Sequence, residues 1–135
     1  MLRFVIDGRV PFKVLVVDDE PLICELVKTL LNETGVEVRS ASSGAEAIEC
    51  AANWLPDLVL LDVVLPGLDG LTTLRLLRAL PGCVEIPIFM LTARVRRTDH
   101  LESSRAGADG HIEKPFRGSE LSELVARLRS VRAPD

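Results

Sequence analysis

Residues 56–67 have the sequence Pro56-Asp57-Leu58-Val59-Leu60-Leu61-Asp62-Val63-Val64-Leu65-Pro66-Gly67, and this stretch decides the fold. Its apolar run at 58–61 is short and unbroken, with a proline before it and Pro-Gly after it. Such a run predicts a strand buried on both faces, which is typical of a parallel sheet covered by helices. The run ends at Asp62, and a buried carboxylate is costly unless another group compensates its charge. We therefore expect the rest of the chain to supply partners for Asp62.

The length and composition are those of one globular domain. The chain has 135 residues, of which 47% are hydrophobic and 27% charged, and its net charge is −4. This balance argues against disorder, and the negative charge argues against direct nucleic-acid binding. No apolar run is long enough to span a membrane, and residues 1–12 lack the apolar core of a secretory signal. The three cysteines lie far apart, which predicts reduced, mostly buried thiols in a cytoplasmic protein.

Predicted strands and helices alternate along most of the chain. Apolar runs predict strands at 13–17, 36–39, 58–62, 86–92 and 110–113. Periodic apolar positions and breakers predict helices at 21–34, 44–53, 71–80 and 96–106, and a last helix along an apolar stripe at 121–131. This alternation indicates an α/β fold with a five-stranded parallel sheet and right-handed crossovers.

The expected fold is a flavodoxin-like three-layer sandwich with strand order 2-1-3-4-5 and helices on both faces. Its crevice would open where the first and third strands meet. We expect residues 13–132 to form this domain, with residues 1–12 as an N-terminal extension and 133–135 as a C-terminal tail.

Three of the helices carry more detailed expectations. The first begins at Pro21, and its apolar spacing is amphipathic, with members at Leu22, Ile23, Leu26, Val27, Leu30 and Leu31. Ser43 and Glu46 form a capping box for the second. The helix at 96–106 has few large apolar residues, mainly Leu101, so we expect it to pack lightly and to be the mobile element.

Polar residues follow four of the predicted strands. The first strand is followed by Asp18 and Asp19, the third ends at Asp62, the fourth at Thr92, and the fifth leads to Lys114. In a parallel sheet these positions share one edge, where three carboxylates would repel one another by several kcal/mol. Mg²⁺ relieves such repulsion and prefers a few carboxylates, with water and phosphate oxygens in the remaining positions. The set therefore predicts a site for phosphoryl transfer.

Asp62 is the candidate nucleophile of this site. No serine, cysteine or histidine stands at its centre, and a carboxylate can itself attack and form an aspartyl phosphate. Asp62 directly follows the buried strand, so its position should be well defined. Asp18 and Asp19 lie in a loop, which suits metal binding.

Taken together, these motifs resemble the receiver domain of two-component response regulators. The resemblance rests on Asp18-Asp19 after an apolar strand, Asp62 followed by Pro66-Gly67, Thr92-Ala93, and Lys114-Pro115-Phe116. It covers about residues 13–132. Each motif alone is weak, but five in this order and at suitable separations are specific.

The resemblance implies a phosphoacceptor and a metal site. Asp62 would take a phosphoryl group from a histidine kinase or a histidine phosphotransfer protein. Asp19 and Asp62 would bind Mg²⁺ (or Mn²⁺) directly, Asp18 would bind it through water, and Val64 would offer its backbone carbonyl.

The resemblance also implies a switch. Thr92 would swing toward the phosphoryl group, Ala93 would leave room for it, and Lys114 would contact it. The Lys114–Pro115 peptide bond would be cis. The face formed by the fourth helix, fifth strand and fifth helix would then change and meet an effector, an output domain or a second copy; its basic residues are Arg96, Arg97, Arg105 and Arg117.

Three further positions bear on how the site would work. The residue three before the lysine is usually an aromatic switch residue, and here it is His111, which can be either a pH-sensitive switch or a half-buried packing residue. Val64 and Arg94 occupy positions that tune dephosphorylation in the family. Because valine cannot orient a hydrolytic water, we expect a long-lived phosphoryl state.

Other functions remain open at this point. Asp18-Asp19 could simply cap the first helix. An Mg²⁺-dependent phosphatase of the aspartyl-phosphate type would share these residues, but it usually has D-x-D on one strand and a cap domain. A flavin carrier would share the sheet order, and a degenerate receiver could serve only as a binding scaffold. We expect no enzyme, apart from self-phosphorylation by small phosphodonors and autodephosphorylation. No output domain follows Asp135, so we expect either a stand-alone regulator or the receiver of a longer one.

Overall fold

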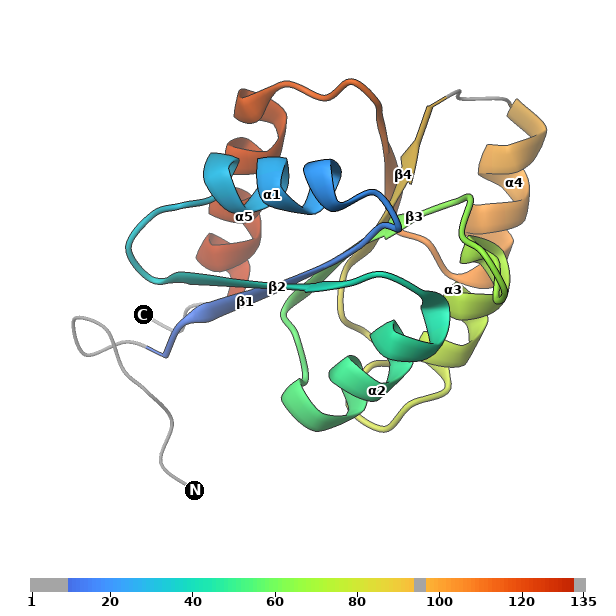
Figure 1. The fold of residues 1–135 in the computed structure, drawn as a ribbon. Coiled ribbons are helices and arrows are strands. Elements are labelled where there is room, and N and C mark those ends of the chain that lie inside the picture. The colour runs from blue at the N-terminus through green and yellow to red at the C-terminus, as the bar shows by residue number, and fades with distance from the viewer. Residues whose placement is uncertain (1–9, 94–96, 133–135) are drawn as a thin grey trace.

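The computed structural model describes residues 10–93 and 97–132. Within them, five strands alternate with five helices (Figure 1). The strands are β1 (Phe12–Val17), β2 (Val36–Ala41), β3 (Leu58–Asp62), β4 (Ile88–Thr92) and β5 (Gly110–Glu113). The helices are α1 (Pro21–Leu30), α2 (Gly44–Trp54), α3 (Gly70–Arg78), α4 (Arg97–Ala106) and α5 (Gly118–Arg132). The tail at 133–135, Arg94, Arg96 and the extension up to position 9 lie outside the described residues.

All five strands are parallel, in the order β2-β1-β3-β4-β5, which confirms the expected sheet. The register pairs Val17 with Leu61, Asp62 with Leu91, and Thr92 with Glu113. The carboxyl ends of β1, β3, β4 and β5 therefore lie at one edge of the sheet. This edge is where the predicted site residues should meet.

Helices cover both faces of the sheet, with α1 and α5 on one face and α2, α3 and α4 on the other (Figure 1). The apolar run of β3 is unbroken because its side chains alternate between two cores. Leu58 and Leu60 pack in the core under α1 and α5, whereas Val59 and Leu61 pack in the core under α2 and α3. All four are fully buried, as expected for a central parallel strand.

Two helices pack differently from the expectation. The buried row of α1 runs through Cys24 and Val27 to Leu31 just past its end, and Leu22 and Leu26 are exposed because they lie on the neighbouring row. In α4 Leu101 is exposed, and the small residues Ser103 and Ala106 face the protein instead. Among the described residues, no helix is both long and apolar enough to cross a membrane.

Candidate functional site

Asp18 and Asp19 begin the connection from β1 to α1. Asp18 is 1% exposed, and its backbone amide donates to the carbonyl of Ala41 at 3.1 Å. Its Oδ1 accepts a hydrogen bond of 2.9 Å from the amide of Glu20, which folds the acidic pair into a tight turn ahead of α1. Asp19 is exposed at the mouth of this turn. The turn thus presents one buried and one accessible carboxylate.

Asp62 is the last residue of β3 and is buried. Its Oδ1 accepts a hydrogen bond of 3.1 Å from the amide of Val64. Gly70, the first residue of α3, packs directly behind it, because a Cβ there would lie 2.4 Å from the carbonyl oxygen of Asp62. The strand and this close packing hold Asp62 in a defined position.

Lys114 reaches this edge from the end of β5. Its Nζ lies 2.7 Å from Asp18 Oδ2 and 3.4 Å from Asp62 Oδ2, and its side chain is 14% exposed. The Lys114–Pro115 peptide bond is cis. One ammonium group thus connects two carboxylates that lie far apart in the sequence.

The electrostatic environment shifts the pKa of both Asp62 and Lys114. Burial raises the pKa of the Asp62 carboxyl above its ordinary value, and the charge of Asp18 adds to this effect, while the Val64 amide and Lys114 oppose it. For Lys114, burial acts to lower the pKa, but the hydrogen bond to Asp18 and the charge of Asp62 outweigh burial and raise it. A further positive charge would therefore stabilise the ionised form of Asp62, and Lys114 stays protonated as an ammonium group.

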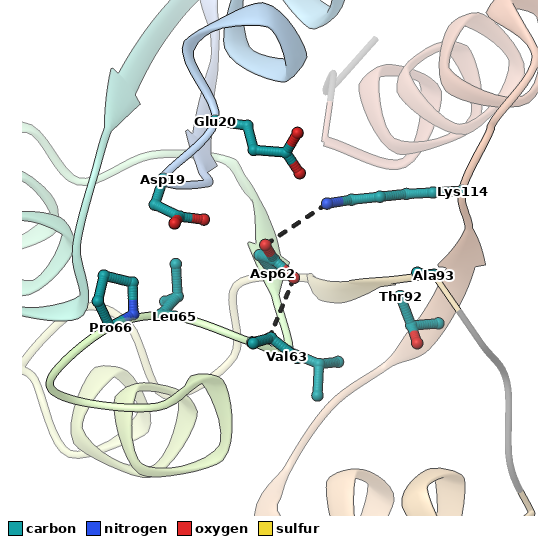
Figure 2. Close-up of a pocket in the computed structure, with 10 residues that line it drawn as sticks. Asp19, Glu20, Asp62, Val63, Leu65, Pro66, Thr92, Ala93 and Lys114 are labelled. Atoms are coloured by element: carbon teal, nitrogen blue, oxygen red, sulfur yellow. Dashed lines mark hydrogen bonds and ion pairs between the residues drawn. The ribbon is translucent and has the colours of Figure 1, made fainter.

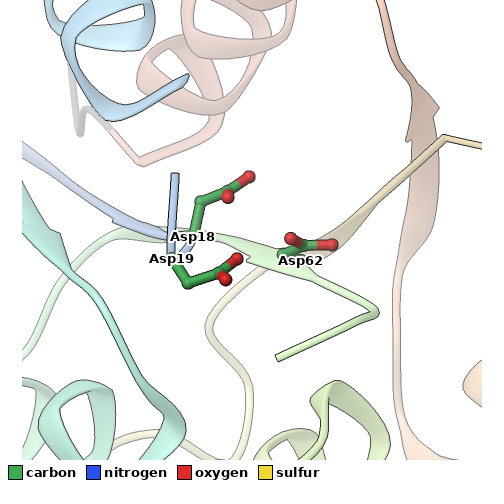
Figure 3. Close-up of side chains that lie close together, drawn as sticks. All are labelled: Asp18, Asp19 and Asp62. Atoms are coloured by element: carbon green, nitrogen blue, oxygen red, sulfur yellow. The ribbon is translucent and has the colours of Figure 1, made fainter. Parts of the chain in front are cut away.

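The three carboxylates can all reach one cation. Asp18, Asp19 and Asp62 each place an oxygen within 4.8 Å of the others, and Figure 3 shows all three side chains directed into the same space. Three carboxylates and one ammonium leave two negative charges, which a divalent cation would balance. Carboxylate oxygens are also the hard ligands that Mg²⁺ prefers. The donor set fits Mg²⁺ or Mn²⁺.

A cavity of about 580 Å³ opens beside the carboxylates (Figure 2). The site residues named from the sequence that line it are Asp19, Asp62, Val64, Thr92, Ala93 and Lys114. Asp18 lies next to it through its contact with Lys114. In Figure 2 the Thr92 hydroxyl points away from Asp62. The structure thus brings most of the named residues together around one opening.

Besides Asp18, two named residues lie outside this lining, and other lining residues were missed. His111 is half-buried in β5, where it is in register with Met90, and Pro115 lines a different surface hollow. Glu20, Val63, Leu65 and Pro66 also line the cavity, although their positions in the sequence predict no site role for them. Glu20 could have been found because it adjoins the acidic pair. The other three became lining residues through the path of the loop after β3.

The chain matches the family model of the response regulator receiver domain over residues 14–126. It is 40% identical over 126 residues to the probable transcriptional regulatory protein TcrX of Mycobacterium tuberculosis, covering 93% of this chain and 51% of that protein. It is 39% identical over 118 residues to the DNA-binding response regulator MtrA of Mycolicibacterium smegmatis, covering 87% of this chain and 49% of that protein. The chain thus spans about half the length of these curated relatives.

The fold is also close to that of solved structures. One is the receiver domain of the sensor histidine kinase PA1611 from Pseudomonas aeruginosa PAO1, with a TM-score of 0.80 and 29% identity over 90% of this chain and 99% of that one. That structure is described as having a magnesium ion coordinated in its active site cleft.

Proposed function

Because this chain belongs to the response regulator receiver domain family of two-component systems, we propose that it accepts a phosphoryl group on Asp62. The donor would be a histidine kinase or a histidine phosphotransfer protein, and the transfer would need Mg²⁺. One observation carries the proposal: the carboxylates of Asp18, Asp19 and Asp62 meet Lys114 at a single edge of the sheet.

In the proposed reaction, a carboxylate oxygen of Asp62 attacks the phosphorus of a phosphohistidine. A P–O bond to Asp62 forms as the P–N bond breaks, and the electron pair of that bond stays on the imidazole nitrogen of the donor. Lys114 binds an oxygen of the transferred group, and Ala93 leaves room for it. Water later attacks the phosphorus, which releases inorganic phosphate and restores the Asp62 carboxylate.

Asp19 and Asp62 would hold the metal ion directly, Asp18 through water, and Val64 through its carbonyl. When bound, the ion supplies positive charge to the oxygens of the transferred phosphoryl group. The raised pKa of Asp62 supports this part of the proposal, since a carboxylate already disfavoured in its charged form gains most from a cation beside it.

The phosphoryl group would act as a switch. Thr92 turns toward it and His111 adjusts beside β4, so that the face made by α4, β5 and α5 changes. Arg105 in α4 and Arg117, directly before α5, are exposed; Arg96 and the side chain of Arg97 lie outside the described residues. An effector, an output domain or a second copy of the chain would bind there.

The remaining expectations stand as parts of the proposal. The receiver domain would comprise residues 13–132 of a cytoplasmic protein. MtrA is named as a DNA-binding protein. For this chain we propose no direct nucleic-acid binding, and its net charge of −4 supports that. The chain would act in signalling and catalyse only its own phosphorylation and dephosphorylation. An Mg²⁺-dependent phosphatase is less well supported, because the candidate nucleophile and the acidic pair come from different strands.

Labelling with acetyl phosphate tests the proposal. The wild type should gain one acid-stable, base-labile phosphoryl group in Mg²⁺ and none when EDTA replaces the metal, as seen by a mobility shift in phosphate-affinity gels. Asp62→Asn should gain none. Asp57→Asn is the matched control, since Asp57 precedes the same strand at its other end, and it should be labelled like the wild type. Equal labelling of Asp62→Asn would refute the proposal.

A further inference from the structure

Arg78, the last residue of α3, holds together several connections far from the phosphoacceptor. Its guanidinium donates hydrogen bonds to five acceptors, and its side chain is 17% exposed. The acceptors are the carbonyl oxygens of Cys83, Val84, Ile86 and Gly107 and the Oδ2 of Asp109. Such a network lies within the reach of arginine, because its planar group has five N–H donors in fixed directions.

These acceptors belong to two separate segments. The first segment connects α3 to β4. The second connects α4 to β5, where Arg78 contacts Gly107 at 2.6 Å and Asp109 at 2.7 Å. Asp109 Oδ2 also accepts from the amide of Ile88 at 2.8 Å, and the amide of Asp109 donates to the Ile88 carbonyl. Arg78 thus ties the end of α4 to the start of β4 and the end of α3.

The packing around Gly107 is close enough to require glycine. Its φ is +111°, and a Cβ there would lie 3.1 Å from Arg78 Nε. The amides of Gly107 and Ala108 donate to the carbonyls of Ser104 and Ser103, which ends α4 at this point. The carboxyl end of α4 is therefore held by hydrogen bonds on both sides of the turn.

The described side chains of α4 bury little apolar area. Leu101 is 51% exposed, and the buried Ser103 and half-buried Ala106 are small. Small side chains bury little apolar area, so they contribute little to holding the helix against the sheet. The carboxyl end of α4 is thus hydrogen-bonded to neighbouring segments, while the described side chains of the helix add little apolar packing.

We propose that Arg78 is the positioning residue that fixes the carboxyl end of α4, so that α4 moves by rotation about this end. The anchoring itself is independent of the proposed function. The rotation rests on the proposed function, since phosphorylation of Asp62 would be what moves the helix.

Amide hydrogen exchange of the unphosphorylated protein tests the anchor. Arg78→Met should speed exchange of the Ile88, Gly107, Ala108 and Asp109 amides by about tenfold or more, because the part-buried carbonyls of Cys83, Ile86 and Gly107 lose their donor. Arg75→Met is the matched control, an exposed arginine one turn earlier in α3, and it should stay within about twofold of the wild type. Arg78→Lys has three donors for five acceptors and should give an intermediate increase.

The local pattern separates anchoring from general stabilisation. Amides of β1 and α2 should keep their wild-type rates in the Arg78 variants. If all amides accelerate equally, or if Gly107 to Asp109 do not change, the anchor is refuted. Should Arg78→Met fail to fold, Arg78→Lys decides between the same outcomes.

A second arm tests the rotation with beryllofluoride, a phosphoryl mimic, and Mg²⁺. In the wild type, the exchange of the Leu101 and Glu102 amides should change, while Gly107 to Asp109 change by less than about twofold. In Arg78→Lys the change should extend to Gly107 to Asp109. Equal changes along α4 in the wild type would refute the rotation. If amide exchange near Asp62 does not change on adding beryllofluoride and Mg²⁺, the proposed function and the rotation are both refuted. The anchor would then still be supported by the exchange of the unphosphorylated Arg78 variants.

Discussion

At the scale of single residues, Asp62 is stabilised poorly as an anion when no metal is present. Its folded-state pKa is raised above that of the unfolded chain, first by burial and then by Asp18. In the pH window between these two values the folded state binds more protons, so stability falls as pH rises through the window and remains lower at neutral pH. The negative charge of Asp62, which metal binding requires, therefore lowers the free energy of unfolding of the metal-free protein.

The destabilisation by the buried charge of Asp62 leads to a prediction for Asp62→Asn. In EDTA at neutral pH, the variant should melt a few degrees above the wild type, since the amide removes the buried charge and can still accept from the Val64 amide. Thermal unfolding by circular dichroism measures the difference. Asp57→Asn should not raise the melting temperature. A lower melting temperature for Asp62→Asn than for the wild type would contradict the account.

Val64 makes a second prediction, about the lifetime of the phosphoryl group. The residue is 76% exposed beside the cavity, and its side chain has no group to orient water. Val64→Asn should therefore shorten the half-life of labelled protein by about tenfold, because a carboxamide can position the attacking water. Val84→Asn, at an exposed valine before β4, is the matched control. The expectation fails if label is lost rapidly and Val64→Asn leaves the rate unchanged.

At the scale of elements, the start of α3 depends on a cap. Asp69 Oδ1 accepts from the amide of Thr72 at 2.7 Å, and this hydrogen bond lowers the pKa of Asp69. Asp69→Ala should lower the free energy of unfolding by about 1 kcal/mol at neutral pH. Urea titration measures this, and Asp69→Asn should retain most of the stability.

The same cap has a pH dependence of defined sign. Because the folded pKa of Asp69 is depressed, the charged cap adds stability above the unfolded pKa, and this is lost as pH falls through the folded pKa. The difference between wild type and Asp69→Ala should therefore shrink in acid, below about pH 4. A difference that grows on acidification would contradict the role of the charged cap.

The elements were predictable from sequence to different degrees. β3 was predictable because its run of apolar residues reflects burial on two faces, and Ser43 caps α2 as expected by accepting from the Glu46 amide. The end of α1 was not: it stops at Leu30, because local hydrogen bonds of Asn32 and Glu33 turn the chain before Gly35. The exposure of Leu101 was also missed, since apolar spacing alone does not show which row of a helix meets the sheet.

At the scale of the whole molecule, the meeting of the site residues followed from topology. In a parallel sheet the carboxyl ends of the strands share one edge, so Asp62, the acidic pair and Lys114 had to converge. The pairing of Lys114 with Asp18 at 2.7 Å was not predictable, because it depends on side-chain conformations set by burial. The network of Arg78 has no sequence signal, since most of its acceptors are backbone carbonyls.

Trp54 reports on the opposite edge of the sheet. Its ring lies 5.4 Å from Lys13 Nζ and 4.5 Å from the Arg39 guanidinium carbon, and Lys13 also donates to its carbonyl oxygen. Because Trp54 is the single tryptophan of the chain and ends α2 away from the acidic site, its fluorescence should change little on adding Mg²⁺. A large quench in a titration would contradict this placement of the metal.

The most direct test of the central claim identifies the modified residue itself. The protein is incubated with acetyl phosphate and Mg²⁺, reduced with borohydride, which converts an aspartyl phosphate to homoserine, and sequenced by tandem mass spectrometry. The account predicts homoserine at position 62 alone, and its absence when EDTA replaces Mg²⁺. Homoserine at another aspartate, with Asp62 intact, would contradict it.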